Sequence, residues 1–162
     1  MSAPNLESRQ LAFMRGGVSI SVASCGSNGM PQLVRAIGCR VSDDGQRVTV
    51  FVPESKSQAV QRDIFANGAI AVAFTQPSTH RTMQLKSRDA RVSTLAPGDA
   101  ELVEAYRNAF VAEVGAIGFH EQMVRTLLSC PAEAMVALTF CPSEAYTQTP
   151  GPNAGKKLEA GE

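Results

Sequence analysis

The chain has 162 residues, of which 44% are apolar and 19% are charged; this is the usual size and composition of one globular domain and excludes a disordered protein. Fifteen basic and fifteen acidic residues give a formal net charge of zero, which argues against a dedicated nucleic-acid-binding protein. No apolar run approaches the roughly 18 residues of a membrane span, and residues 1–8 lack the blocks of a signal peptide. We therefore expect a single domain over residues 1–162 in a soluble, cytoplasmic protein without nucleic-acid or membrane partners.

Four cysteines are spread along the chain, at Cys25, Cys39, Cys130 and Cys141, with no C-x-x-C pair and two histidines in all. This spacing predicts no metal site. Each cysteine lies in or beside an apolar run, so we expect reduced, buried side chains.

The first elements predicted are a short helix over residues 6–14 and a three-stranded antiparallel meander. Its strands are expected at 18–23, 31–41 and 48–52. Two turn signals separate them, Gly26-Ser27-Asn28-Gly29 and Asp43-Asp44-Gly45.

Between Pro53 and Gly68 the apolar period becomes helical, with Ala59, Ile64 and Phe65 expected to face inward. Ser55 or Ser57 is the expected cap. Residues 69–74 are so apolar that they predict a strand buried on both faces.

The second half continues with an alternating strand over 81–86 and a strand over 134–140, separated by a helical segment at about 97–128. Residues 149–162 form a Pro/Gly-rich tail that can be neither helix nor central strand. The chain is therefore expected to be mainly β, of the α+β class, with about six antiparallel strands curled into a barrel and helices inserted.

The residues best suited to bind a ligand lie at the start of the second predicted helix. Ser55, Lys56 and Ser57 combine hydroxyls and an ammonium with unpaired backbone donors, which suits a phosphate group. Serine caps are also commonplace, so a purely structural role stays open. Arg35 interrupts an apolar strand and needs a counter-charge, either an anionic ligand or an Asp or Glu side chain.

The remaining polar candidates are less specific. Arg81 and Lys86 lie in the fifth strand, where they could equally protect a solvated sheet edge. His80 and His120 have no partner at motif spacing, and the aromatic residues Tyr106, Phe110 and Phe119 are expected in the core or a dimer contact.

Several segments together resemble the pyridoxamine 5'-phosphate oxidase-like flavoproteins. They are Val48–Pro53, Ala66-Asn67-Gly68, Ala69–Phe74, His80–Ser87 and the closing run Gln148–Gly155. The resemblance covers most of the chain, and residues 97–128 match it poorly.

This resemblance implies a split β-barrel that forms a homodimer, with one FMN in each of two clefts between the subunits. Position by position, it implies that the flavin phosphate is bound by Arg35, Ser55, Lys56 and Ser57. It implies that Phe51 and Val52 border the flavin ring and that Arg81 and Thr82 lie beside the cofactor on the fifth strand. For Phe51 and Val52 the implied contact is through the backbone.

Two departures limit the resemblance. Ser87 stands where such sequences commonly have glycine, and the C-terminal Trp and Arg pattern of the true vitamin B6 oxidase is missing. The expected function is therefore FMN-dependent hydride transfer to or from another small molecule, with Gln84 and Lys86 contacting that substrate or the flavin edge. The alternative is a flavin- or haem-binding protein for storage or sensing, without turnover.

Overall fold

The computed structural model describes residue 4 and residues 6–158. In these residues the helices are α1 (Ser8–Met14), α2 (Glu54–Asn67), α3 (Asp99–Gly115), α4 (Glu121–Leu127) and a 3-10 turn at Ala132–Ala134. The strands are β1 (Ser19–Cys25), β2 (Pro31–Arg35), β3 (Cys39–Val41), β4 (Val48–Pro53), β5 (Ile70–Thr75), β6 (Thr82–Ser87), β7 (Arg91–Ser93), β8 (Met135–Phe140) and β9 (Glu144–Thr147).

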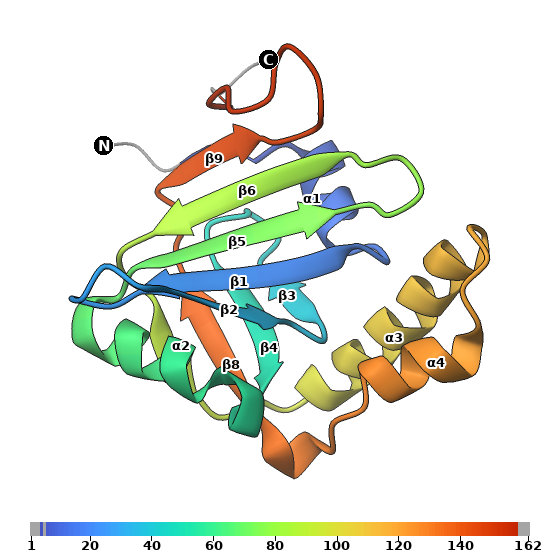
Figure 1. Ribbon diagram of the computed structural model, residues 1–162, viewed down its shortest axis with the longest axis horizontal. Coiled ribbons are helices and arrows are strands. Elements are labelled where there is room, and N and C mark those ends of the chain that lie inside the picture. Colours follow the sequence, from blue (N-terminus) through green and yellow to red (C-terminus); the bar gives the residue numbers. More distant parts are fainter. Residues whose placement is uncertain (1–3, 5, 159–162) are drawn as a thin grey trace.

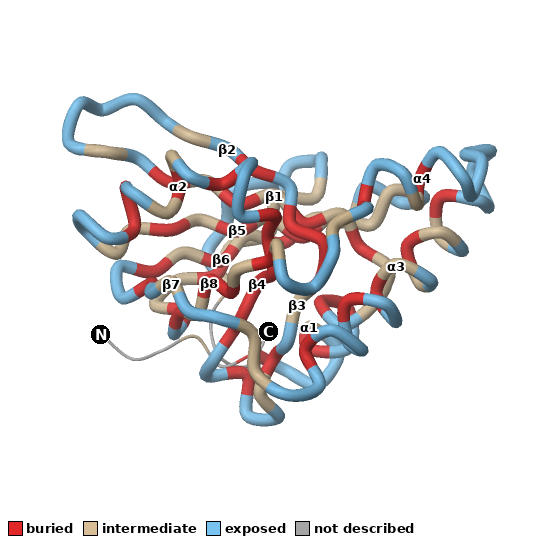
Figure 2. The backbone as a smooth tube through the Cα atoms, turned by 90° about the horizontal axis from the view of Figure 1, so that it is seen from below, coloured by how far each residue is buried: buried red, intermediate tan, exposed pale blue. Residues whose placement is uncertain are grey.

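These strands form two antiparallel sheets. Sheet A has the order β2-β1-β5-β6-β9, and sheet B has the order β3-β4-β8-β7. Buried positions gather where the two sheets face each other (Figures 1 and 2). The antiparallel α+β class is confirmed, but the expected six-stranded barrel is corrected to two sheets with nine strands that do not close into one barrel within the described residues.

The predicted strand over residues 31–41 is in fact two strands in different sheets. The Ala36 amide donates to Ile20 O in sheet A (2.9 Å), whereas the next amide, of Ile37, donates to Phe51 O in sheet B (2.8 Å). Gly38 makes the change of sheet possible, because its φ of 154° disfavours residues with a Cβ. The three-stranded meander is therefore wrong.

Helix α2 fills the open side between the sheets, as Figure 1 shows. It ends at Gly68, whose φ of 67° is suited to glycine and whose amide donates to Ile64 O (2.8 Å). Pro53 precedes the helix without a side-chain cap, so the predicted serine cap is wrong. The inward residues include Val60 and Ile64, while Phe65 points outward and is 76% exposed.

Two short strands escaped the sequence analysis. β7 and β9 have three and four residues, too few for a period of two to be recognised. After β9 the tail folds back along the edge of sheet A, where the Leu158 amide donates to Ala145 O (2.8 Å). The last four residues of the predicted tail lie outside the described residues.

The cysteines differ from their predicted burial. Cys39 and Cys130 are half-buried, but Cys25 and Cys141 are exposed. Cys25 is the last residue of β1, next to the exposed hairpin turn, so no core surrounds it. None of the helices within residues 6–158 has the length and apolar character that a membrane crossing requires.

Candidate functional site

The outer face of sheet A carries several of the predicted site residues. Along β1, β5 and β6, every second side chain packs toward sheet B and the others point away. We define the outer face by three cross-strand rows: Ser19, Thr75 and Thr82; Arg35, Ser21, Ala73, Gln84 and Tyr146; and Leu33, Ala23, Ala71, Lys86 and Glu144. Figure 1 shows no helix of the described residues over this face.

Small side chains floor the middle of the outer face. Ser21 and Ala73 lie between Arg35 on the edge strand and Gln84 on β6, so about three strand spacings of roughly 4.8 Å separate these two longer side chains. Met83 and Leu85 are buried on the opposite face, as the alternation predicts. The resulting surface is a shallow floor with polar groups at both ends.

Arg35 is exposed at the edge of this floor. Its Nη1 donates to Ser19 Oγ (2.8 Å), and no carboxylate lies within ion-pair distance among the described residues. The alternative of an Asp or Glu partner therefore does not apply in this part of the chain. The predicted cost of burying Arg35 does not arise, because the side chain points to the outer face of an edge strand.

The start of α2 lies at the same corner of the molecule as Arg35. Two backbone hydrogen bonds join residues 37–38 to Phe51, and Phe51 lies three residues before the first residue of α2. Because Arg35 lies two residues before Ile37, these bonds bring the end of β2 and the start of α2 together. The exposed Ser55 and Lys56 lie in this first helical turn.

Ser57 faces the opposite way and is fully buried. Its hydroxyl donates to Pro53 O (2.7 Å) and accepts from Gln61 Nε2 (2.9 Å). This back-bond within the first turns commits the hydroxyl to the helix itself. The structure therefore brings Ser55 and Lys56 to the surface, but not Ser57.

Phe51 and Val52 also lie away from the surface, with side chains that are fully buried. The Phe51 amide donates to Gly38 O (3.0 Å), and its carbonyl accepts from the Ile37 amide. Val52 is opposite Val136 in the β4–β8 pair. The backbone groups of Phe51 are thus committed to chain pairing.

Arg81 and Thr82 point in different directions. The Arg81 guanidinium lies 4.4 Å from the centre of the Phe13 ring, beside α1. Thr82 lies on the outer face and donates from Oγ1 to Thr75 Oγ1 (3.1 Å). The structure therefore groups Thr82 with Arg35 and leaves Arg81 apart.

Gln84 and Lys86 lie on the outer face near β9. Gln84 Oε1 accepts from Gln148 Nε2 (3.2 Å), and Lys86 Nζ lies 4.9 Å from the Tyr146 ring centre. The Tyr146 hydroxyl donates to Glu144, which lowers the pKa of that carboxyl and raises the pKa of the tyrosine. This end of the face can offer an amide and a cation to a ligand.

A groove of about 640 Å³ opens beside Arg35, between the end of sheet A and the hairpin of α3 and α4. Its polar rim consists of Ser19, Arg35, Thr75 and His80. The remaining lining is apolar: Pro77, Phe110, Val114, Ile117, Phe119, Met123, Val124 and Leu127. We call the cavity lined by these twelve residues the groove.

Sequence analysis missed the groove. Tyr106 and Phe110 are buried and stacked, with ring centres 5.9 Å apart, which confirms their predicted core position, but Phe119 is half-exposed in the groove. A usable signal was present in α4, where Met123 and Leu127, four residues apart, are apolar beyond the buried Val124.

No family model and no curated protein matches this chain. Solved structures do match. HupZ from Group A Streptococcus has a TM-score of 0.55 at 17% identity, over 93% of this chain and 100% of that one. A candidate pyridoxamine 5'-phosphate oxidase from Lactobacillus delbrueckii has a TM-score of 0.55 at 12% identity, over 88% and 93%. This is the fold of the pyridoxamine 5'-phosphate oxidase-like proteins.

An F420 reductase is similar in the same way, with a TM-score of 0.50 at 15% identity, over 83% of this chain and 93% of that one. The comparisons confirm the resemblance at the level of the fold. Within this pyridoxamine 5'-phosphate oxidase-like fold, Arg35, Thr82, Gln84 and Lys86 share the outer face of sheet A, with Ser55 and Lys56 at its Arg35 corner.

Proposed function

We propose that this protein binds FMN between two copies of the chain and uses it for hydride transfer to or from a small molecule. The observation that carries the proposal is Arg35, an exposed guanidinium with one hydrogen bond and no carboxylate partner among the described residues. Its remaining N–H donors can bind an anion, and a phosphate group accepts from the guanidinium fork in a bidentate way.

The neighbouring residues fit the rest of the cofactor. Ser55, Lys56 and the free amides of the first turn of α2 lie at the same corner and add donors for the phosphate. Thr82 and Gln84 rise from the shallow floor of Ser21 and Ala73, where a flat ring can approach the sheet. When bound, FMN accepts or donates the hydride. The chain holds and orients it, with Lys86 and Gln84 proposed to contact the edge of the flavin ring.

A second copy of the chain is proposed to cover the outer face. One row of this face is largely apolar, with Leu33 72% exposed beside Ala23 and Ala71. The β5 sequence is apolar on both sides, yet its outer side chains are only half-buried in the single chain. A homodimer would bury this surface and close the cofactor between the copies.

The experiment is an FMN titration of flavin-free protein. Arg35→Ala is expected to weaken FMN binding more than tenfold, since a charge-assisted hydrogen bond contributes about 1.5 to 3 kcal/mol. Arg62→Ala is the matched control, because Arg62 is an exposed arginine of α2 without a hydrogen bond or ion pair in the described residues; its affinity should stay within about twofold. Equal losses in both variants, or none in Arg35→Ala, would contradict the phosphate role.

The second candidate is a flavin or haem carrier without turnover. The observation that favours it is His80 at the rim of the groove, because an imidazole beside apolar walls suits haem ligation. The absorbance spectrum of the purified protein separates the cofactors, flavin bands from an intense Soret band. Reduction by NADH or NADPH with an electron acceptor present then separates an enzyme from a carrier, and a monomeric mass by light scattering would contradict the interface site.

A further inference from the structure

The groove is adjacent to the proposed phosphate contact but has a different chemistry. Arg35 lies at its rim, and most of its lining is apolar. We propose that the groove binds a neutral, apolar ring compound and that this is the substrate class of the flavin site. The inference rests on the proposed function for the identity of the cofactor, and on the groove itself for the chemistry of the substrate.

The exposed apolar side chains of the hairpin are concentrated in the groove. Ile117, Phe119, Met123 and Leu127 are each about half exposed, from 46% to 53%, and all four line it. Contiguous exposed apolar surface in a concave site is typical of a ligand pocket. Its volume of about 640 Å³ lies within the roughly 300 to 1,000 Å³ of such pockets.

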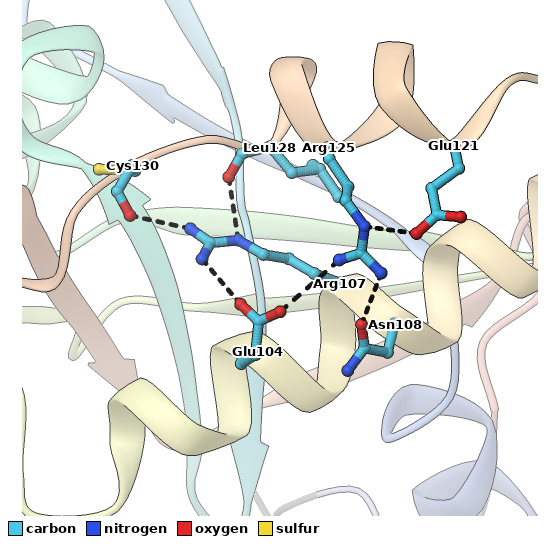
Figure 3. A network of polar contacts seen from close by, with 7 residues as sticks. All are labelled: Glu104, Arg107, Asn108, Glu121, Arg125, Leu128 and Cys130. Atoms are coloured by element: carbon cyan, nitrogen blue, oxygen red, sulfur yellow. Dashed lines mark hydrogen bonds and ion pairs between the residues drawn. The ribbon is translucent and has the colours of Figure 1, made fainter.

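A network of polar contacts connects α4 and the segment after it to α3 (Figure 3). Arg107 donates to the carbonyls of Leu128 (3.1 Å) and Cys130 (2.9 Å). Arg125 donates to Glu121 (2.7 Å) and Asn108 (2.9 Å). The bond to Asn108 joins α4 to α3, and the Arg107 bonds tie the segment after α4 to the same helix, so the apolar side chains are held at the groove in advance of binding.

The opposite wall of the groove, formed by the β5–β6 turn, is hydrogen-bonded to α3. Glu113 of α3 accepts hydrogen bonds from the Ser78 amide (3.0 Å) and from the Ser78 hydroxyl. Ser78 belongs to the β5–β6 turn that carries Pro77 and His80 into the groove. Both walls are therefore attached to α3, and the groove is a built feature of the fold.

Charge decides what kind of apolar molecule fits. No carboxylate lines the groove among the described residues, so no side chain there can form an ion pair with a cationic ligand. If Arg35 is occupied by the FMN phosphate, the polar groups that remain are His80 and the hydroxyls of Ser19 and Thr75. These groups suit a hydrogen-bonding oxygen on an uncharged body, while Phe119 and Met123 suit an aromatic ring.

The test uses Prodan, a neutral naphthalene ketone, as the probe. Equilibrium dialysis against the FMN-loaded protein measures its affinity for the wild type, Leu127→Ser and Met123→Ser. Each variant is expected to bind Prodan about tenfold more weakly, because an apolar contact is replaced by a hydroxyl. FMN affinity should stay within about twofold of the wild type.

Leu102→Ser is the matched control. Leu102 is an exposed leucine of α3, 41% accessible, that lines a different cavity together with Arg40. Its Prodan affinity should equal that of the wild type. Leu102, Met123 and Leu127 are partly exposed, so the three variants are expected to have similar melting temperatures. If Leu127→Ser does not fold, Met123→Ser tests the groove instead.

Three results would overturn the inference. They are a wild type that does not bind Prodan, equal affinities in all variants, and a change from dimer to monomer in Leu127→Ser, which would make the groove a contact between copies. Loss of FMN binding is a separate outcome. A wild type that binds no FMN contradicts the proposed function, whereas dialysis of the flavin-free protein still measures the contrast between Leu127→Ser and Leu102→Ser.

Discussion

The central strands of the two sheets differ in how many of their side chains are buried. In sheet B, all six residues of β4 are buried. In sheet A, β5 and β6 bury every second residue and leave the others on the outer face. A strand with one free face can display polar side chains without losing core contacts, as β5 and β6 do and β4 does not.

The same division sorts the residues that the resemblance assigned to the cofactor. Arg35 and Thr82 belong to the outer face or its edge in sheet A, whereas Phe51 and Val52 are fully buried in sheet B. Substitutions in the first group should change ligand binding, and those in the second should change stability.

Phe51→Ala is expected to have the largest effect on folding. Removing a fully buried phenyl ring from β4 leaves a cavity and should lower the free energy of unfolding by about 3 to 5 kcal/mol. Ser21→Ala on the outer face of sheet A should change it by less than about 0.5 kcal/mol. Urea denaturation followed by circular dichroism measures both, and similar losses would remove the distinction between the sheets. Phe51→Leu provides a milder variant if Phe51→Ala does not fold.

Much of the fold could be predicted because local signals agree with it. Gly68 ended a helix and Gly45 marked a hairpin, and both have a positive φ. The change of sheet after Arg35 could not be predicted, since residues on either side of it follow the same strand period and the decision lies in hydrogen bonds to β1 and β4, which are distant in sequence. Phe65 was misplaced because burial on α2 depends on where sheet A lies.

The candidate site was predictable where it depends on alternation. The period of two placed Gln84 and Lys86 opposite the buried Met83 and Leu85. The sequence could not show that the Ser57 hydroxyl donates to Pro53 O, because the position of a serine on a helix does not decide whether its hydroxyl is hydrogen-bonded. The groove depends on how Arg107 ties α3 to residues beyond α4, a contact without a local sequence signal.

Leu33→Asp tests whether a second copy covers the outer face. A carboxylate in this row of each copy would need to be desolvated in the dimer, so the dimer should dissociate at least tenfold more readily. Sedimentation of a dilution series measures this, and FMN affinity should fall in parallel. Phe65→Asp is the comparison, because Phe65 is similarly exposed but lies on α2. A wild type that sediments as a monomer, or equal effects of the two variants, would contradict the proposed interface.

The smallest expected effect concerns the tie between α3 and the β5–β6 turn of sheet A. The hydrogen bond from the Ser78 hydroxyl, supported by weaker effects of the Ser78 amide and the Gln76 side chain, holds the pKa of the Glu113 carboxyl below its usual value, against the opposing effect of burial. A lowered pKa in the folded state means that the stabilisation is complete above the unfolded-state pKa of about 4.3 and is lost as the pH falls through the folded-state value.

Glu113→Gln should therefore lower the free energy of unfolding near pH 7 and make its decline below about pH 4.5 shallower. The loss should be at most about 1 kcal/mol, because Glu113 is well solvated and water screens its charge. Glu101→Gln is the control, because the Glu101 carboxylate lies on the same helix and has no hydrogen bond or ion pair among the described residues. This variant should leave the pH dependence of the unfolding free energy unchanged. Urea titrations at a series of pH values measure both. If the two variants have the same slope, Glu113 does not couple the sheet A turn to α3, and the wall of the groove formed by the turn must be held by its backbone alone.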